Sequence, residues 1–245
     1  MGPTSPAVLY PAIALVAFLY SAVGHAGASG YIAVLTLAGL TPAEVRPTAL
    51  VLNVLVATLA TFQFWRAGHF RWPLFWPFAL LSIPAAYLGG SLPVPSEIFK
   101  PIVGGVLLLS AARFLVRTSD RDRTSPPPLG VALATGAALG LLAGITGTGG
   151  GIFLTPVMLF AGWAKTKETA AVSAPFILVN SASGLFGFLQ TGEPLPRLAW
   201  PLAAIAISGG LAGSYLGSRR FPVRTVRLIL AVVLLIAGAK LLFRF

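Results

Sequence analysis

The chain contains no cysteine and very few charged side chains. Of its 245 residues only 9% are charged, six are Asp or Glu and two are His. Without cysteine there can be no disulfide, no thiolate metal site and no thiol redox chemistry. Soluble domains carry about 25% charged residues. The low charge, together with a hydrophobic share of 56%, therefore indicates an integral membrane protein.

The positions of the carboxylates argue against an enzyme. All six fall in predicted loops or at the ends of predicted spans: Glu44, Glu97, Asp120, Asp122, Glu168 and Glu193. No carboxylate pair, H-E-x-x-H or G-x-S-x-G pattern occurs, so a hydrolase would have no general base other than His25. The run "GITGTGGG" is not followed by G-K-[ST], which excludes a P-loop ATPase. We expect no enzymatic activity and no cofactor.

Positive charge is in excess, and the formal net charge is +11. In a soluble protein this balance would suggest nucleic-acid binding. Here the basic residues lie between apolar stretches, where the positive-inside rule places them. The expected surroundings are therefore a lipid bilayer, with no nucleic-acid partner.

Apolar stretches of about 20 residues recur along the chain, the length at which a helix spans a bilayer. Runs such as "VLNVLVATLATF" and "LILAVVLLIAGAKLLF" lack the alternation of outer-membrane strands. The sequence predicts an all-α, polytopic membrane protein. Its long spans are expected near 6–24, 47–66, 73–92, 98–117, 128–146, 170–190, 196–217 and 223–243, with short segments near 29–42 and 150–164.

The polar stretch "RTSDRDRTSPPP" divides the chain near its midpoint. It predicts an N-terminal transmembrane repeat over 1–117, a polar linker over 118–127 and a C-terminal transmembrane repeat over 128–245. Each half has a run of small residues, a short apolar piece, a charged turn and a span that contains an asparagine, Asn53 or Asn180. Such internal repeats are common in secondary transporters.

The short segments leave two topologies open. If they dip in and return, each half crosses four times, the repeats are parallel, and the 17 Lys and Arg divide nine to eight between the sides. If they cross, each half has five segments, the repeats are inverted, and the division is twelve to five. The positive-inside rule favours the inverted arrangement, with both termini outside.

The small-residue runs, "GHAGASG" from Gly24 and "GITGTGGG" from Gly144, come directly before the short segments. Non-helical backbone at membrane depth is tolerated only where protein or a water-filled cavity satisfies it. A helix that starts after such a run presents free N–H groups and positive partial charge, which bind anions. Two broken helices meeting at mid-membrane would form an anion site without lysine or arginine. The alternative is that the glycines serve only close helix packing.

The second-half sequence "GITGTGGGIFLTPVMLFAGWAKTKETAAVSAPFILVNSASGLFGF" resembles the signature of the TauE/SafE sulfite exporter family, also called the toluene sulfonate uptake permease family. The matching positions are Gly147, Gly149, Gly150, Gly151, Pro156, Gly162, Ala170, Ala171 and Ser173. "GHAGASGY" resembles the first repeat more loosely, with departures at His25 and Ala28. The resemblance covers essentially the whole chain. It implies a transporter of small organosulfur anions, such as sulfite or sulfonates.

The sequence therefore predicts a secondary transporter of such anions in the cytoplasmic (inner) membrane, and it leaves a homo-oligomer open as a partner state. The alternative is a passive small-anion channel. The expected substrate-binding residues are His25, Ala26, Gly27, Ala28, Ser29, Gly30, Asn53, Thr146, Gly147, Thr148, Gly149, Gly150, Gly151, Ser173 and Asn180. His25 is an ionisable group inside the membrane, so it could carry a proton or pair with the anion.

Overall fold

Every regular element in the described part of the chain is a helix, as the sequence predicts. The computed structural model describes residues 6–92, 108, 111–112 and 123–243. Most of the expected span 98–117, and residues 118–122 of the expected linker, lie outside these ranges. The elements are α1 (Pro6–Ala22), α2 (Ala28–Leu37), α3 (Pro42–Arg66), α4 (Trp72–Ser91), α6 (Leu129–Thr146), α7 (Gly151–Ala161), α8 (Thr166–Leu189), α9 (Ala199–Tyr215), the π-helical η1 (Leu216–Arg220) and α10 (Val223–Phe243).

Within the described ranges, five helices are long and apolar enough to cross a membrane: α3, α4, α6, α8, and α9 with η1. A multi-pass helical membrane protein is thus confirmed. Helices α2 and α7 have 10 and 11 residues, or about 15–17 Å at 1.5 Å per residue. They are too short to cross 30 Å of hydrocarbon alone.

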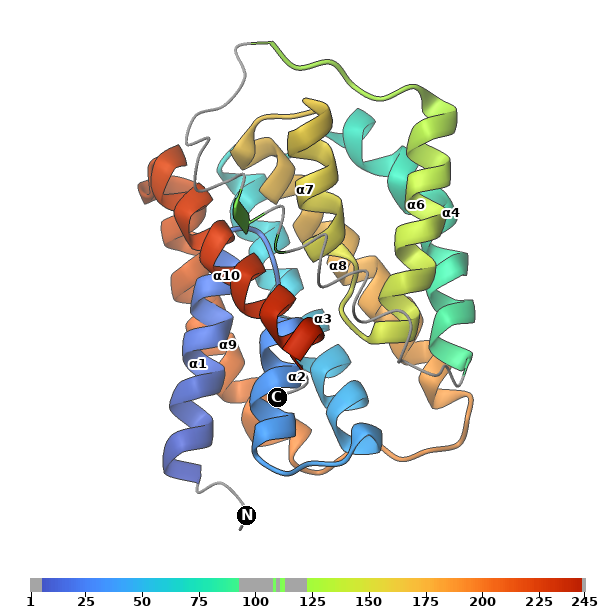
Figure 1. The fold of residues 1–245 in the computed structure, drawn as a ribbon, viewed down its shortest axis with the longest axis vertical. Helices are drawn as coiled ribbons and strands as arrows, with labels where there is room; N and C mark the ends of the chain where they lie inside the picture. The colour runs from blue at the N-terminus through green and yellow to red at the C-terminus, as the bar shows by residue number, and fades with distance from the viewer. Residues whose placement is uncertain (1–5, 93–107, 109–110, 113–122, 244–245) are drawn as a thin grey trace.

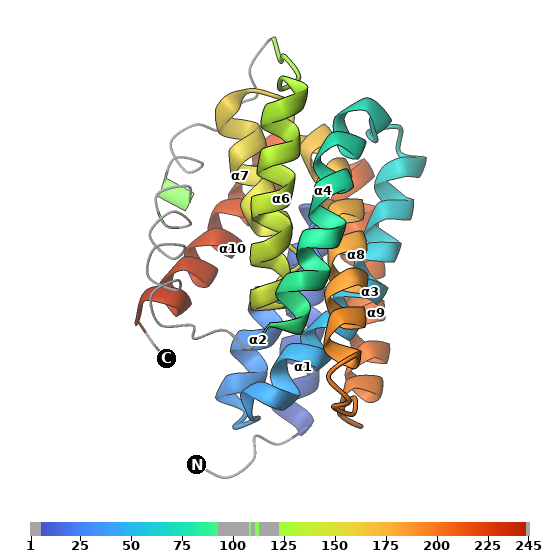
Figure 2. The ribbon, with the colours of Figure 1, turned by 90° about the vertical axis from the view of Figure 1, so that its right-hand side faces the viewer.

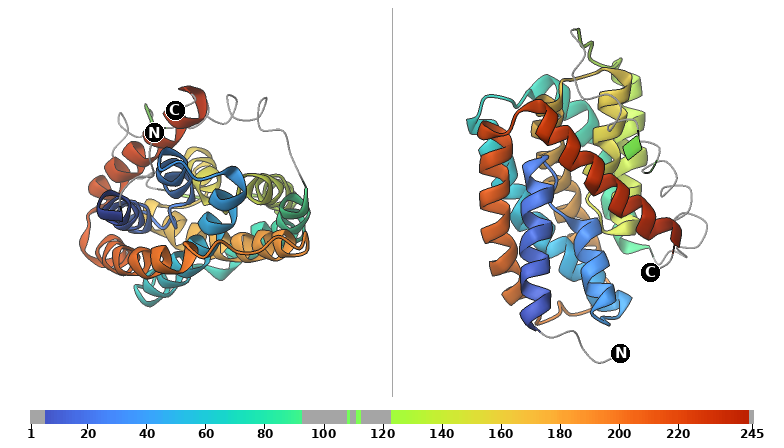
Figure 3. Two further views of the ribbon diagram at one scale, coloured as in Figure 1. Left: turned by 90° about the horizontal axis from the view of Figure 1, so that it is seen from below. Right: turned by 60° about the vertical axis from the view of Figure 1, so that its left-hand side comes forward.

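Helices α3 and α8 pack against each other at the centre of the bundle. Helix α1 packs on α9 at one side, and α4 packs on α6 at the other (Figure 1). Figure 2 shows the α4–α6 pair from the front. Helix α10 runs obliquely across the outside of the bundle (Figure 3). This arrangement leaves α2 and α7 to pack on the central pair, α2 on α3 and α7 on α8.

The two short helices run in opposite directions. Helix α1 rises from the lower end of Figure 1, and α2 returns toward that end. Helix α6 descends from the upper end, and α7 returns toward it. Each short helix thus leads back to the end from which its long predecessor started. The next helices, α3 and α8, begin at those opposite ends.

Glycines spaced four residues apart bring both outer helix pairs into close contact. In α6, a Cβ on Gly136, Gly140 or Gly144 would collide with the carbonyl oxygens of Phe78, Ser82 and Ala86 on α4. In α9 and η1, the same is true of Gly209, Gly213 and Gly217 against Ala14, Phe18 and Ala22 on α1. Small residues at this spacing let transmembrane helices approach until their backbones touch.

Basic side chains gather where α3, η1 and the starts of α4, α8 and α10 meet. His69 Nε2 and Lys167 Nζ both lie within hydrogen-bond distance of the Ser218 carbonyl oxygen, at 3.1 and 3.4 Å. Arg71 forms an ion pair with Glu168 at 3.3 Å. The buried Arg227 donates from Nε to Thr166 Oγ1 at 2.8 Å. These contacts place the start of α8 and the end of η1 at one end of the bundle.

Candidate functional site

Two non-helical connections approach each other inside the bundle. One joins α1 to α2 and contains Gly24 and Gly27, with φ of 76° and 108°; the other joins α6 to α7. Helix α6 ends because Gly147, its C-cap, adopts the left-handed conformation with φ 71°. Helix α7 begins after Gly150, which has φ 79° and accepts from the Phe153 and Leu154 N–H groups at 3.0 Å. Glycine adopts this conformation without the steric cost that a Cβ brings.

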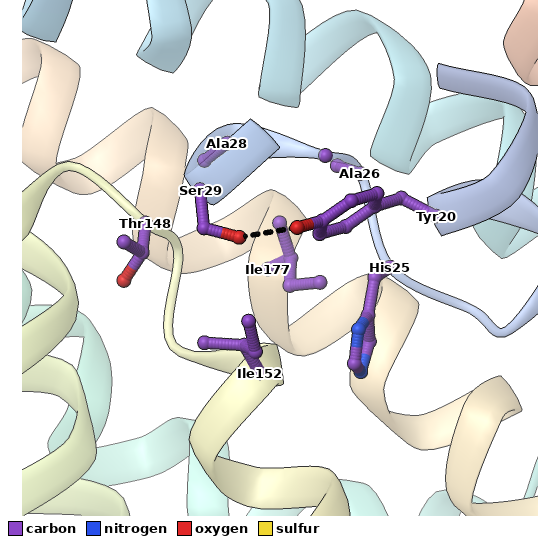
Figure 4. A pocket seen from close by; sticks show the side chains of 9 residues that line it. Tyr20, His25, Ala26, Ala28, Ser29, Thr148, Ile152 and Ile177 are labelled. Atoms are coloured by element: carbon purple, nitrogen blue, oxygen red, sulfur yellow. Dashed lines mark hydrogen bonds between the residues drawn. The ribbon is translucent and has the colours of Figure 1, made fainter. Parts of the chain in front are cut away.

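A small pocket lies between the two connections. It is lined by Tyr20, His25, Ala26, Gly27, Ala28, Ser29, Thr148, Ile152 and Ile177 (Figure 4). Its cavity volume is about 10 Å³, close to the least that holds one water molecule, about 10–15 Å³. The first turns of α2 and α7 both border it, through Ala28, Ser29 and Ile152. The N-terminal ends of both short helices therefore lie at the pocket.

His25 connects the first half of the chain to the second. Its Nε2 lies 2.7 Å from Thr155 Oγ1 on α7, and that hydroxyl lies 2.8 Å from Ser173 Oγ on α8. All three side chains are buried, and His25 is 2% exposed. His25 Nδ1 has no hydrogen-bond partner among the described residues. A buried polar atom without a partner costs free energy, so this nitrogen is suited to bind a ligand.

Tyr20 also lines the pocket, although the sequence did not predict it as a site residue. Its hydroxyl lies 2.8 Å from Ser29 Oγ, across the connection between α1 and α2 (Figure 4). Thr155 was missed as well. Both residues sit within apolar helical stretches, and nothing in the spacing of their neighbours distinguishes them. Only the tertiary contact with the connections reveals them.

The expected site residues fall into three groups. His25, Ala26, Gly27, Ala28, Ser29 and Thr148 line the pocket. Gly147, Gly149, Gly150 and Gly151 form the α6–α7 connection and the start of α7, while Thr146 reaches it through a 2.8 Å contact with Thr148. Gly30, Asn53, Ser173 and Asn180 lie further away: Gly30 faces Val16 and Tyr20, and Ser173 is joined to the pocket through Thr155.

The two asparagines do not occupy matching places. Asn53 Nδ2 donates to Ser181 Oγ at 3.2 Å, and this pair contacts the position where a Cβ on Gly149 would be. Asn180 Nδ2 donates instead to the Phe176 carbonyl of its own helix at 2.8 Å. Asn53 thus supports the connection between α6 and α7. Asn180 is occupied within α8.

Arg46 joins three helices beside the same connection. Its Nη2 donates to the carbonyl oxygens of Gly89, Gly90 and Gly144 at 3.0, 2.9 and 2.6 Å. These carbonyls belong to the last turns of α4 and α6, where the helix dipole favours a cation. A Cβ on Gly147 would lie 3.1 Å from Arg46 Cγ. Arg46 therefore holds the ends of α4 and α6 against α3.

We expect Arg46→Met to lower the free energy of unfolding by about 2 kcal/mol, because three carbonyls lose a charged donor. Thermal unfolding of the purified protein in detergent measures this. Arg197→Met is the matched control, since Arg197 is an exposed cation in the loop before α9. Equal stability of the two variants would contradict the clamping role of Arg46.

Comparison with known proteins identifies the family. The family model for the sulfite exporter TauE/SafE matches residues 9–241. The chain is 44% identical over 235 residues to the probable membrane transporter protein y4hK of Sinorhizobium fredii, covering 94% of this chain and 95% of that protein. It is 29% identical over 238 residues to the probable membrane transporter protein YjnA of Bacillus subtilis, covering 89% and 92%.

A third relative is archaeal. The probable membrane transporter protein MJ0441 of Methanocaldococcus jannaschii is 23% identical over 208 residues, covering 80% of this chain and 77% of that protein. No solved structure matches the chain significantly. The sequence-based expectations of family and of a non-enzymatic role are confirmed. The chain belongs to the TauE/SafE sulfite exporter family, and it is a membrane transporter.

Proposed function

We propose that this protein is a secondary transporter of small organosulfur anions, sulfite or a sulfonate, and that the anion binds in the pocket between the two glycine-containing connections. One observation carries the proposal: the first turns of α2 and α7 border a common pocket together with the unpartnered His25 Nδ1. The first N–H groups of a helix have no intrahelical partner and favour negative charge. The lining residues include no lysine, arginine, aspartate or glutamate.

The small volume of the pocket favours a carrier over an open channel. Sulfite and sulfonates are larger than one water molecule, so binding requires the two connections to move apart. A carrier closes around its site between loading and release, whereas a channel keeps a continuous path. A passive small-anion channel is the alternative that flux measurements would reveal.

We propose further that the halves are inverted repeats. Two observations support this: α1 packs on α9 as α6 packs on α4, and α3 packs on α9 as α8 packs on α4. The starts of α3 and α8 also match, because the Thr41 N–H donates to Glu44 Oε2 at 2.9 Å and the Lys165 N–H donates to Glu168 Oε2 at 3.0 Å. In such transporters one part rocks against the other around a central site.

The distribution of basic residues indicates how the protein is oriented in the membrane. The end of the bundle that holds Arg71, Lys167 and Arg227 is rich in basic residues, so the positive-inside rule places it in the cytoplasm. We therefore infer insertion in the cytoplasmic membrane with α1 starting from the outside. A reporter joined after Phe245 is expected to be exposed outside the cell.

Flux in proteoliposomes tests the proposed function. Sulfite and methanesulfonate uptake should saturate, and trapped anion of the same kind inside the vesicles should accelerate it. Thr148→Val keeps the shape of a pocket residue but removes its hydroxyl. We expect about fivefold weaker binding, since one hydrogen bond contributes about 1 kcal/mol.

Thr58→Val is the matched control. Thr58 is exposed, and its hydroxyl donates to the Val54 carbonyl of its own helix at 2.7 Å. The Thr58→Val variant should bind and transport both anions as the unmodified protein does. Uptake that does not saturate and is not accelerated by internal anion would indicate a channel. Absence of uptake and of any thermal stabilisation by either anion would refute the proposed function.

A further inference from the structure

The environment of His25 distinguishes its two ring nitrogens. Nε2 faces α7, where Thr155 Oγ1 lies 2.7 Å away and the Gly151 carbonyl is a nearby backbone acceptor. A carbonyl oxygen is only an acceptor, so this side of the ring favours a hydrogen on Nε2. Thr155 can then pass its own hydrogen on to Ser173 Oγ, 2.8 Å away. Nδ1 is left as the ring atom available to the pocket.

In this neutral form Nδ1 presents a lone pair to the pocket. Sulfite and sulfonate oxygens are acceptors, so a lone pair facing them is repulsive. The contact becomes favourable when Nδ1 carries a proton. The ring is then an imidazolium, with Nε2–H still donating toward α7 and Nδ1–H donating to the anion.

Nothing charged in the described part of the protein compensates an imidazolium at this place. The carboxylates among those residues, Glu44, Glu168 and Glu193, lie in first turns of helices or in a loop. The groups that face His25 are the neutral Tyr20 ring of α1, 6.5 Å away between centroids, Ala26 to Ser29, Thr148 and Ile152, Thr155 of α7, and Ile177 of α8. A buried charge is costly unless an opposite charge pairs with it. The bound anion is the charge that could do so.

We propose that His25 takes up a proton at Nδ1 together with the anion, so that proton and anion are carried as a pair. The inference rests on the proposed function. The proton comes from water on the loading side and returns to water on the other side, and no other bond changes. For a monovalent anion the loaded site gains no net charge. Thr155 and Ser173 act as positioning residues, because they keep Nε2 as the donor on the α7 side.

Coupling of this kind is reciprocal. If anion binding favours the proton, a proton favours the anion by the same factor. One linked proton makes anion affinity rise by up to about tenfold for each unit of falling pH. Methanesulfonate is a suitable probe, because methanesulfonic acid is fully ionised at every pH at which proteins stay folded. The anion itself therefore brings no proton to the site.

Nitrogen NMR of the histidine rings gives a readout that does not depend on flux. The chain has two histidines, so His69→Gln leaves His25 as the single labelled ring. His69 belongs to the loop before α4 and contacts the Ser218 carbonyl, away from the pocket. We expect hydrogen on Nε2 alone without anion, and on both nitrogens with methanesulfonate. A ring that is neutral in both states overturns the proposal.

Two variants separate positioning from binding. Thr155→Val leaves the Gly151 carbonyl as the acceptor on the α7 side, so it should reduce the preference for Nε2–H in the free protein, and it should weaken methanesulfonate binding by about fivefold, the loss of one hydrogen bond. Ser208→Ala, which removes an exposed hydroxyl on α9 that donates to Ile205, should change neither quantity. Unchanged ring signals in Thr155→Val would contradict the positioning role.

Proton movement completes the test. In proteoliposomes with an internal pH indicator, methanesulfonate uptake should acidify the interior with one proton per anion. In His25→Gln any remaining uptake should occur without acidification. Uptake by the unmodified protein with no proton movement would overturn the proposal and leave the proposed function standing. If neither methanesulfonate nor sulfite enters the vesicles or changes the His25 signals, both the proposed function and the proton coupling fail.

Discussion

Gly140→Leu is expected to lower the free energy of unfolding by at least about 3 kcal/mol, the upper part of the range for an overpacked interior. A side chain at Gly140 would collide with the backbone of Ser82, which is already in contact across α4 and α6. A flexible side chain could change its rotamer to avoid the collision, but a backbone carbonyl cannot. The two helices must separate, and the contacts at Gly136 and Gly144 are lost with them.

Gly130→Leu provides the control on the same helix. No atom lies within 4 Å of a Cβ at Gly130, which is exposed near the start of α6. Both variants gain helix propensity and apolar surface, so their difference isolates the helix crossing. Thermal unfolding in detergent should separate their midpoints by roughly 6–12 °C. Coincident midpoints would mean that the α4–α6 contact does not stabilise the fold.

Transport by Gly149→Ala is expected to fall below about a tenth of the normal rate. Gly149 has φ +72°, and a non-glycine residue in this conformation costs about 1–2 kcal/mol. Its Cβ would also lie 2.6 Å from Ser181 Oγ and 2.7 Å from Ile177 Cγ2. The added methyl therefore displaces the Asn53–Ser181 pair and the pocket residue Ile177. A change of about 1.4 kcal/mol at the site already corresponds to tenfold in binding.

Gly192→Ala carries the same backbone cost without the contacts. Gly192 has φ +80° in the loop before α9, and nothing lies within 4 Å of its Cβ position. Stability should fall similarly on backbone grounds in both variants, whereas uptake should fall only in Gly149→Ala. Initial rates of sulfite uptake, corrected for the amount of folded protein, make the comparison. Normal uptake by Gly149→Ala would show that the α6–α7 connection does not shape the substrate site.

The helices could be predicted from the sequence because a chain in hydrocarbon has to satisfy its own backbone groups. The residues at which the helices begin could be predicted less accurately. Helix α3 begins at Pro42 rather than near 47, and α8 at Thr166 rather than near 170. In both, Glu44 or Glu168 bonds to the backbone N–H of the capping residue, so the helix extends beyond its apolar stretch. Hydropathy alone assigns these polar first turns to the preceding loops.

The site could be predicted only in outline. Both connections contain glycines with positive φ, and few other residues adopt the backbone that Gly147 and Gly150 require. The partners of those connections could not be found in the same way. His25 and Thr155 are separated by 130 positions, and their contact depends on how α7 rests on α8. The asparagines also look equivalent in sequence, yet Asn53 donates to Ser181 beside the α6–α7 connection, whereas Asn180 donates to the Phe176 carbonyl of its own helix.

The close contact of α1 with α9 has a consequence for biogenesis. Helix α1 is made before α9 and η1, yet the glycines that fit its backbone belong to those two later elements. At about 5–20 residues per second, a ribosome needs roughly 10–35 s to reach α9 after completing α1. During that interval α2 and α3 can already pack on α1, but the face of α1 that packs on α9 contacts only lipid or the insertion machinery. The α1–α9 contact therefore forms only after the intervening helices have been made, so α1 reaches its final packing late in synthesis.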